Sequence, residues 1–130
     1  MGRLRIDRLT GPPGPLATDR GRLLAARCYR AASPLARLVG LLGTPDLAED
    51  EAVWLEPCAS VHALGLRARI GCAFLDGDGA VLRVVDPLPR LRFAAARGAQ
   101  AAVECPAGRL AGVAPGTRLH RGDPGVVSRT

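Results

Sequence analysis

The sequence predicts a mainly β fold, a small β-sandwich or barrel-like domain with one short helix near the N-terminus. Three observations lead to this fold class. From residue 52 onward, short apolar runs at regular spacing alternate with turns rich in glycine and proline, a pattern typical of small sandwiches and barrels. Aromatic residues make up only 3% of the chain, so Leu, Val and Ala have to form the core. Helical spacing of apolar residues stands out in one segment, residues 33–43.

The length of 130 residues fits a single domain with one hydrophobic core. With 48% apolar residues the chain is too hydrophobic for a disordered protein, and its glycines and prolines lack the period of collagen. Glycine and proline dominate residues 11–15, so we expect a flexible leader over residues 1–20. A single mostly β domain over residues 21–120 and a flexible tail over residues 121–130 complete the expected organisation.

The first elements of the domain are a strand and a helix. Ordered structure is expected to begin near Arg22, and residues 22–31 (RLLAARCYRA) have the length of a strand. In residues 33–43, Ser33 is a suitable N-cap and Pro34 fits the first helical position, so this segment is the predicted short helix. The acidic residues 49–51 that follow indicate an exposed loop.

The segment FLDGDGAVLRVV, residues 74–85, contains the clearest local signal. Two apolar runs flank the turn sequence DGDG, whose glycines can adopt the positive φ that a tight hairpin needs. A calcium-binding loop would need further ligands and a closing bidentate Glu, which are absent from the sequence. We therefore predict a hairpin with a buried Phe74. Weaker strands are predicted at LRFAAA and QAAVECPAG, and one short strand among turns at GVAPGTRLHRGD.

The positive charge is concentrated in the N-terminal part of the chain. All 18 basic residues are arginines, and residues 1–37 carry the whole formal net charge of +6, so the remainder is neutral. This distribution describes an arginine-rich arm attached to a balanced domain. Binding of nucleic acid or anionic lipid through the arm is not the favoured function, because no aromatic stacking residues accompany the arginines.

The compartment is predicted from the apolar runs and the cysteines. No run is long enough to span a membrane, and the first residues lack the uninterrupted apolar stretch of a secretory signal. We therefore expect a cytoplasmic protein in which Cys28, Cys58, Cys72 and Cys105 are reduced thiols. Three of the four lie in apolar surroundings, where cysteine behaves as a small core residue.

Residues 52–85 carry a resemblance to a known family. The stretch AVWLEPCASVHALGLRARIGCAFLDGDGAVLRVV is similar to the pattern L-W-L-x-P-C-x-S-V-H-T-x-G-M-x-x-P-I-D-V-x-F-L-D-x-x-G-x-V-L of the prokaryotic family called domain of unknown function 192. The matching positions are Trp54, Leu55, Pro57, Cys58, Ser60, Val61, His62, Gly65, Ile70, Phe74, Leu75, Asp76, Gly79, Val81 and Leu82. Further matches lie upstream, at Arg37 and Gly40 to Gly43, and downstream, at Leu88, Arg92, Glu104, Ala107, Gly108 and Gly116.

The resemblance extends from about residue 21 to residue 119 and implies a compact, mostly β domain with one short helix. It implies no particular reaction, because the family has no established activity. The chain departs from the pattern at Ala63, Leu66 and Arg69, and Gly71 stands where the family has an acid. A glycine can neither orient a histidine nor act as a base, so we expect this region to serve packing or binding.

Five residues form the candidate pocket: Trp54, Cys58, Ser60, His62 and Glu104. Cys58 and His62 could supply a nucleophile and its base, or two ligands for zinc. Zinc requires three or four ligands, and the remaining cysteines and the second histidine are isolated in the sequence, so we expect no metal and no cofactor. No residue is assigned as catalytic. In the plainer interpretation Cys58 packs in the core and His62 hydrogen-bonds the backbone.

The acidic residues allow two interpretations each. Glu104 lies within an otherwise apolar strand, where it either pairs with an arginine such as Arg37 or Arg92 or has a pKa raised by burial and acts as an acid. Asp76, Asp78 and Asp86 could form a catalytic set, but aspartates around a hairpin mostly stabilise the turn.

The favoured function is that of a non-enzymatic binding or interaction module with a protein partner. A small hydrolase or ligand-binding pocket around Cys58 and His62 is the alternative from the enzyme class. Weak nucleic-acid binding through the basic arm is the second alternative. The sequence predicts no oligomeric state.

Overall fold

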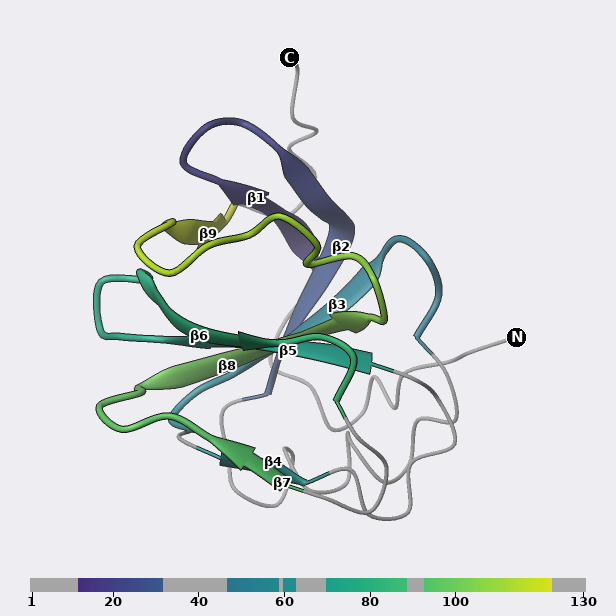
Figure 1. The fold of residues 1–130 in the computed structure, drawn as a ribbon. Helices are drawn as coiled ribbons and strands as arrows, with labels where there is room; N and C mark the ends of the chain where they lie inside the picture. Colours follow the sequence, from purple (N-terminus) through teal and green to yellow (C-terminus); the bar gives the residue numbers. More distant parts are fainter. Residues whose placement is uncertain (1–11, 32–46, 59, 63–69, 89–92, 123–130) are drawn as a thin grey trace.

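A computed structural model gives the fold of the protein over residues 12–31, 47–58, 60–62, 70–88 and 93–122 (Figure 1). Strands dominate these residues, as the sequence predicts. Their bounds are β1 Gly14–Thr18, β2 Leu23–Ala31, β3 Glu51–Leu55, β4 Ser60–His62, β5 Ile70–Leu75, β6 Val81–Val85, β7 Phe93–Ala95, β8 Ala101–Pro106 and β9 Leu119–Arg121.

Seven strands form one sheet in the order β6-β5-β8-β3-β2-β1-β9, and β4 pairs with β7 in a separate two-stranded sheet. All neighbours in the large sheet are antiparallel except β2 and β3, which run parallel. The long connection between β2 and β3 is consistent with this pairing, because parallel neighbours need a crossover whereas antiparallel ones can be joined by a tight turn.

The large sheet curls until its edge strands, β6 and β9, touch at their first residues only. The backbone N–H of Val81 at the start of β6 donates to the carbonyl of Thr117 at 2.7 Å, and the N–H of Leu119 in β9 donates to the carbonyl of Gly79 at 2.9 Å. A β-bridge between Ala80 and Arg118 lies between these bonds. The sheet is therefore a half-barrel, which confirms the mainly β, barrel-like fold class.

Alternation along the strands separates two cores. One contains side chains from both ends of the curled sheet, such as Leu16 of β1, Val81 of β6 and Leu119 of β9, and so fills its concave side, here called the inner face. The other contains Val53 of β3, Phe74 of β5 and Ala94 of β7, and lies on the opposite, outer face of the sheet. Because Ala94 belongs to it, the β4–β7 pair packs against the outer face of the large sheet.

The hairpin between β5 and β6 confirms the clearest sequence prediction. The Asp76 N–H and the Ala80 carbonyl close the turn at 2.9 Å, and Gly79 takes a φ of 84°. Asp76 Oδ1 accepts hydrogen bonds from the backbone N–H groups of Asp78 and Ala80, at 2.8 and 3.0 Å. The aspartate thus stabilises the turn, and Phe74 is fully buried as predicted.

The leader predicted over residues 1–20 is corrected by β1. Gly14–Thr18 pairs with β2 on one side and with β9 on the other, and Leu16 is completely buried. Proline and glycine around this strand resemble a linker in the sequence, but the apolar residues between them complete the inner core. The predicted strand at residues 22–31 is confirmed as β2. The predicted helix at residues 33–43 lies outside the described residues.

Candidate functional site

Glu104 lies on the outer face of the large sheet, in β8. Its register partners are Val53 of β3 and Cys72 of β5, and it is 2% exposed. Its Oε2 atom has no hydrogen-bond partner among the described residues. Burial raises the pKa of the Glu104 carboxyl to about 8, so this group is protonated at neutral pH.

Two cysteines lie close to this carboxyl. The pKa of the Cys72 thiol is raised by burial and, to a smaller extent, by the charges of Glu104 and Cys58, which places the three side chains near one another. Cys58 belongs to the outer core, and its backbone N–H donates to the carbonyl of Gln100 at 2.9 Å. Of the five predicted pocket residues, Cys58 and Glu104 therefore both lie near Cys72 on the outer face.

Ser60 and His62 lie on β4, which pairs with β7 through Ala95 and Phe93. The described part of the chain includes the backbone of this strand but not the side chains of the two residues. Their proposed contacts with Cys58 and Glu104 stay a prediction.

The thiols themselves are buried. Burial raises the pKa of Cys28 to about 12, and it raises the pKa of Cys72 and Cys105 as well. Because the thiolate is the nucleophile and the metal ligand, these three side chains stay in their unreactive protonated form at neutral pH. Within the residues that the structure describes, no group of three His, Cys, Asp or Glu side chains could hold a metal ion.

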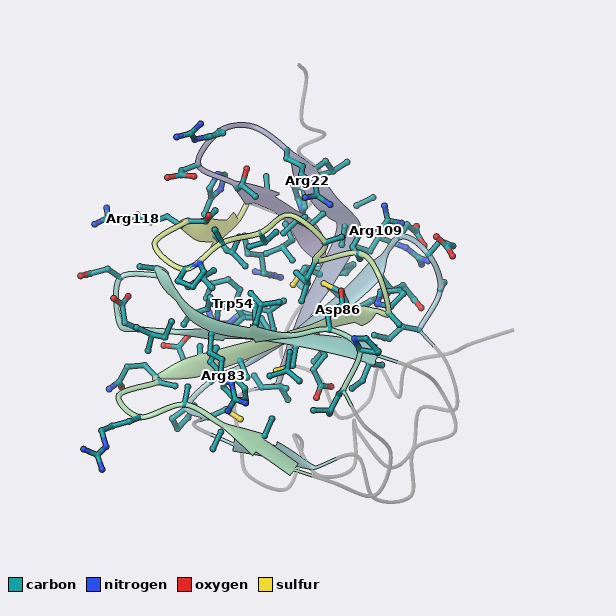
Figure 2. The ribbon with its side chains drawn as sticks, viewed as in Figure 1. Arg22, Trp54, Arg83, Asp86, Arg109 and Arg118 are labelled. Carbon is teal, nitrogen blue, oxygen red and sulfur yellow. The ribbon has the colours of Figure 1, made fainter. Side chains whose placement is uncertain are left out.

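Trp54, the fifth predicted residue, lies on the opposite side of the sheet. It pairs with Val103 of β8, whose side chain belongs to the inner core, and it packs against that core itself. Trp54 and Glu104 therefore occupy different faces. Figure 2 shows Trp54 on the side of the sheet that faces β9.

Trp54 lines a groove at one end of the half-barrel, here called the mouth groove. This groove has a volume of about 320 Å³. Its aromatic, charged and imidazole lining side chains are those of Arg30, Trp54, Glu56, Asp78, His120 and Arg121. These residues belong to the ends of β2, β3 and β9 and to the β5–β6 turn. The mouths of β-barrels are frequent ligand sites because the strand ends place polar groups around an apolar floor.

Hydrogen bonds fix two of these side chains. The indole Nε1 of Trp54 donates to Oε1 of Glu56 at 2.8 Å. Arg121 donates from Nε to the Cys28 carbonyl at 2.7 Å and from Nη2 to the Pro12 carbonyl at 2.5 Å. The ring and one guanidinium are thus held in place, which lowers the entropy that a ligand would have to remove on binding.

Apart from Trp54, sequence reasoning missed this groove. One signal was available: Cys28 and Arg30 are two residues apart in a strand, so an inward Cys28 implies an inward Arg30. The proximity of Arg121 had no such signal, because it depends on the pairing of β9 with β1.

A further group of residues lies where β5 begins and β6 ends. A Cβ atom on Gly71 would be 2.5 Å from Cγ and 2.7 Å from Oδ1 of Asp86, so the Asp86 carboxyl occupies the space of a side chain at position 71. Its oxygens accept hydrogen bonds from the backbone N–H groups of Gly108, at 2.8 Å, and Leu110, at 3.0 Å. Figure 2 shows Asp86 next to the loop that carries Arg109.

The family model of domain of unknown function 192, DUF192, described as an uncharacterized ACR, matches residues 16–121. The chain belongs to the DUF192 family. No curated protein matches it.

Two solved structures share the fold of this DUF192 domain. One is a protein from Sinorhizobium meliloti 1021, named as a proposed transcription regulator, with a TM-score of 0.73 at 20% identity over 87% of this chain and 95% of that chain. The other is a protein of unknown function from Novosphingobium aromaticivorans DSM 12444, with a TM-score of 0.71 at 16% identity over 92% of this chain and 99% of that one. At these identities the likeness shows the fold alone.

Asp86, at the end of β6, places its carboxyl beside Gly71, the position at which the sequence resemblance implies an acid. A carboxyl group is thus present there, and it binds the backbone of the turn after β8. In the described part of the DUF192 domain, no helix is long and apolar enough to cross a membrane.

Proposed function

We propose that this DUF192 domain is a non-enzymatic binding module and that the mouth groove is its binding surface. The observation that carries the proposal is the half-buried Trp54 at the open end of the half-barrel, with two arginines beside it. An indole with one accessible face and a fixed N–H gives a large contact area at little entropic cost, which is why tryptophan is common in binding sites.

The buried thiols and the protonated Glu104 support binding rather than catalysis. A nucleophile needs a lowered pKa or a base within hydrogen-bond distance, whereas burial shifts the pKa of Cys28 and Cys72 upward. As part of the same proposal we place the protein in the cytoplasm, where such thiols stay reduced.

Nuclear magnetic resonance of the labelled protein tests this function. Trp54 is the only tryptophan, so a single indole N–H signal reports on the groove. The probes are a panel of cationic, neutral and anionic metabolites and of short peptides. We expect at least one probe to shift this signal saturably without being converted, and Trp54→Ala to weaken its affinity about tenfold, measured by calorimetry.

The control is Leu82→Ala, which removes an exposed apolar side chain of β6 outside the mouth groove. It should leave the affinity unchanged. If no probe shifts the indole signal, or if both variants weaken binding equally, the mouth groove is not the binding surface.

A second candidate is a small hydrolase around Cys58 and His62. The unpartnered Oε2 of Glu104 near Cys58 favours it, because a buried carboxyl without a partner can donate or accept a proton. Hydrolysis of p-nitrophenyl acetate by Cys58→Ser, His62→Ala and the unchanged protein separates the two functions. Equal rates in all three support the binding module, and a loss in both variants supports the hydrolase.

A further inference from the structure

The ligand class of the mouth groove follows from three side chains that share the inner face, and this inference rests on the function proposed above. Arg30 is the register partner of Trp54 in the parallel pair β2–β3. Arg121 is the register partner of Leu16 in the pair β1–β9, and Leu16 is completely buried in the inner core. Register partners point to the same face, so all three side chains turn into the half-barrel at its mouth.

The two guanidinium groups act on a common neighbour. Arg121 and Arg30 both lower the pKa of Cys28, the inner-core thiol just below them, although burial has the larger and opposite effect. Both positive charges therefore lie near the same part of the inner core, at Cys28.

Neither charge is neutralised by a carboxylate among the described residues. The hydrogen bonds of Arg121 go to carbonyl oxygens, and the ion pairs of the described part join Arg27 to Asp50 and Glu51, and Arg109 to Glu49. Two neighbouring guanidinium groups over a low-dielectric floor attract an anion, which each can bind through charge-assisted hydrogen bonds.

The acids of the mouth groove have separate roles. Glu56 accepts the indole N–H of Trp54 at 2.8 Å, so it orients the ring. Asp78 lies in the β5–β6 turn, which contacts β9 through Gly79 and Leu119. Among the described residues it forms no ion pair with Arg30 or Arg121. A ligand with a hydrogen-bond donor on its ring can use these acceptors in addition to the arginines.

The volume limits the size of the ligand. About 320 Å³ lies at the lower end of the usual range for small-molecule sites, which suits one ring with a short substituent.

We propose that the mouth groove binds a small flat molecule that carries an anionic group, with the ring against Trp54 and the anion at Arg30 and Arg121. The anionic group is a carboxylate or a phosphate, and the experiment distinguishes the two.

The test follows the indole signal of Trp54 during titrations of the full-length protein. The probes are benzoate, phenyl phosphate, benzylamine, acetate and inorganic phosphate. We expect benzoate or phenyl phosphate to bind about tenfold or more tightly than benzylamine, and more tightly than the two anions without a ring. The better of the two aromatic anions identifies the anionic group.

Three substitutions that each remove one positive charge locate the effect. Arg30→Gln and Arg121→Gln should raise the Kd of the aromatic anion about tenfold or more, since each removes charge-assisted hydrogen bonds. Arg118→Gln is the matched control, because Arg118 is exposed, does not line the groove and projects away from the molecule (Figure 2). Because Arg121 also bonds two backbone carbonyls, Arg121→Lys, which keeps the charge, accompanies it if Arg121→Gln fails to fold.

Two results would overturn the ligand class. One is benzylamine binding as tightly as the aromatic anions, and the other is Arg30→Gln behaving like Arg118→Gln. If the aromatic anions leave the indole signal unchanged while another class of probe shifts it, the ligand class is wrong and the binding module stands. If no probe of any kind shifts the signal, both proposals fail.

Discussion

At the scale of single residues, Gly71 has no side chain, and the carboxyl of Asp86 occupies the space where one would lie. The Asp86 carboxyl fills the space beside the Gly71 Cα and binds the backbone of Gly108 and Leu110. A side chain at position 71 would displace the Asp86 carboxyl. The two residues therefore form one unit that ties the end of β6 to the turn after β8.

The first prediction concerns this unit. Gly71→Ala should lower the free energy of unfolding by about 1–3 kcal/mol, because its Cβ would overlap the Asp86 carboxyl. Gly71→Asp should cost at least as much alone, and less when combined with Asp86→Gly, since neighbouring substitutions are not additive. Urea denaturation measures both. Gly77→Ala is the control, because its Cβ would meet only Gln100 at 3.8 Å. Equal effects at Gly71 and Gly77 would contradict the prediction.

The second prediction concerns the pH dependence of stability through Glu104. Its ordinary pKa of 4.5 applies to the unfolded chain, whereas the pKa in the folded protein is about 8. Between these values the folded protein keeps a proton that the unfolded chain has released. The contribution of Glu104 to the free energy of unfolding is therefore at its most favourable below about pH 4.5. It decreases as the pH rises to about 8, by up to about 1.4 kcal/mol per pH unit.

Glu104→Gln removes this titration while keeping the shape of the side chain. Urea denaturation from pH 5 to pH 9 should show the variant gaining stability over the unchanged protein as the pH rises. Asp78→Asn, at an exposed turn, serves as the control and should run parallel to the unchanged protein. Parallel curves for Glu104→Gln as well would show that the carboxyl does not titrate in this range.

At the scale of elements, β5 is the strand that both cores share. All six of its residues are buried, with Phe74 and Cys72 in the outer core and Ala73 and Leu75 in the inner core. It is paired on both sides, with β6 through the hairpin and with β8. A strand buried on both faces transmits any loss of packing to both cores.

The third prediction is that Phe74→Ala lowers the free energy of unfolding by about 3–5 kcal/mol, because Phe74 is fully buried and its removal leaves a cavity. Leu82→Ala in the next strand should change it by less than about 0.5 kcal/mol, since Leu82 is 38% exposed. Chemical denaturation of the two variants gives the comparison. A change within experimental error for Phe74→Ala would mean that the hairpin has another register.

At the scale of the whole molecule, β1 and β9 close the half-barrel. Three backbone hydrogen bonds join residues 79–81 to residues 116–119, and β9 is attached to the rest of its own sheet through β1. Arg22, directly before β2, adds a long-range link by donating to the carbonyls of Ala111 at 2.6 Å and Arg109 at 2.8 Å. Closure therefore depends on the first described strand.

The fourth prediction is that removing residues 2–18 prevents cooperative folding, because it deletes β1, leaves β9 unpaired on that side and exposes the inner core. Circular dichroism during thermal unfolding measures the cooperativity. A shorter truncation, of residues 2–11, keeps β1 and separates its effect from that of the arginine-rich segment before it. A cooperative transition in the longer truncation would show that the domain folds without β1.

Local chemistry determined the parts of this protein that its sequence predicts by itself. The DGDG turn contains within four residues the groups that close it, and apolar runs of strand length need only their neighbours along the chain to be recognised. The family motif was likewise readable over one continuous stretch. The β-rich fold, β2, the β5–β6 hairpin and the buried Phe74 follow from these short-range signals.

Only the tertiary structure decided which distant residues meet. The apolar core of β1 is short and lies between prolines and glycines, so its pairing with β2 and β9 shows in no local pattern. The register of β3 and β8 pairs Glu104 with Val53, so Trp54 lies on the inner face and Glu104 on the outer face, although both belong to the sequence-predicted pocket. The pairing of β9 with β1 brings Arg121 from the last strand to the inner face that Arg30 and Trp54 share. Such contacts depend on strand order and register, which are set by packing over the whole chain and not by neighbouring residues.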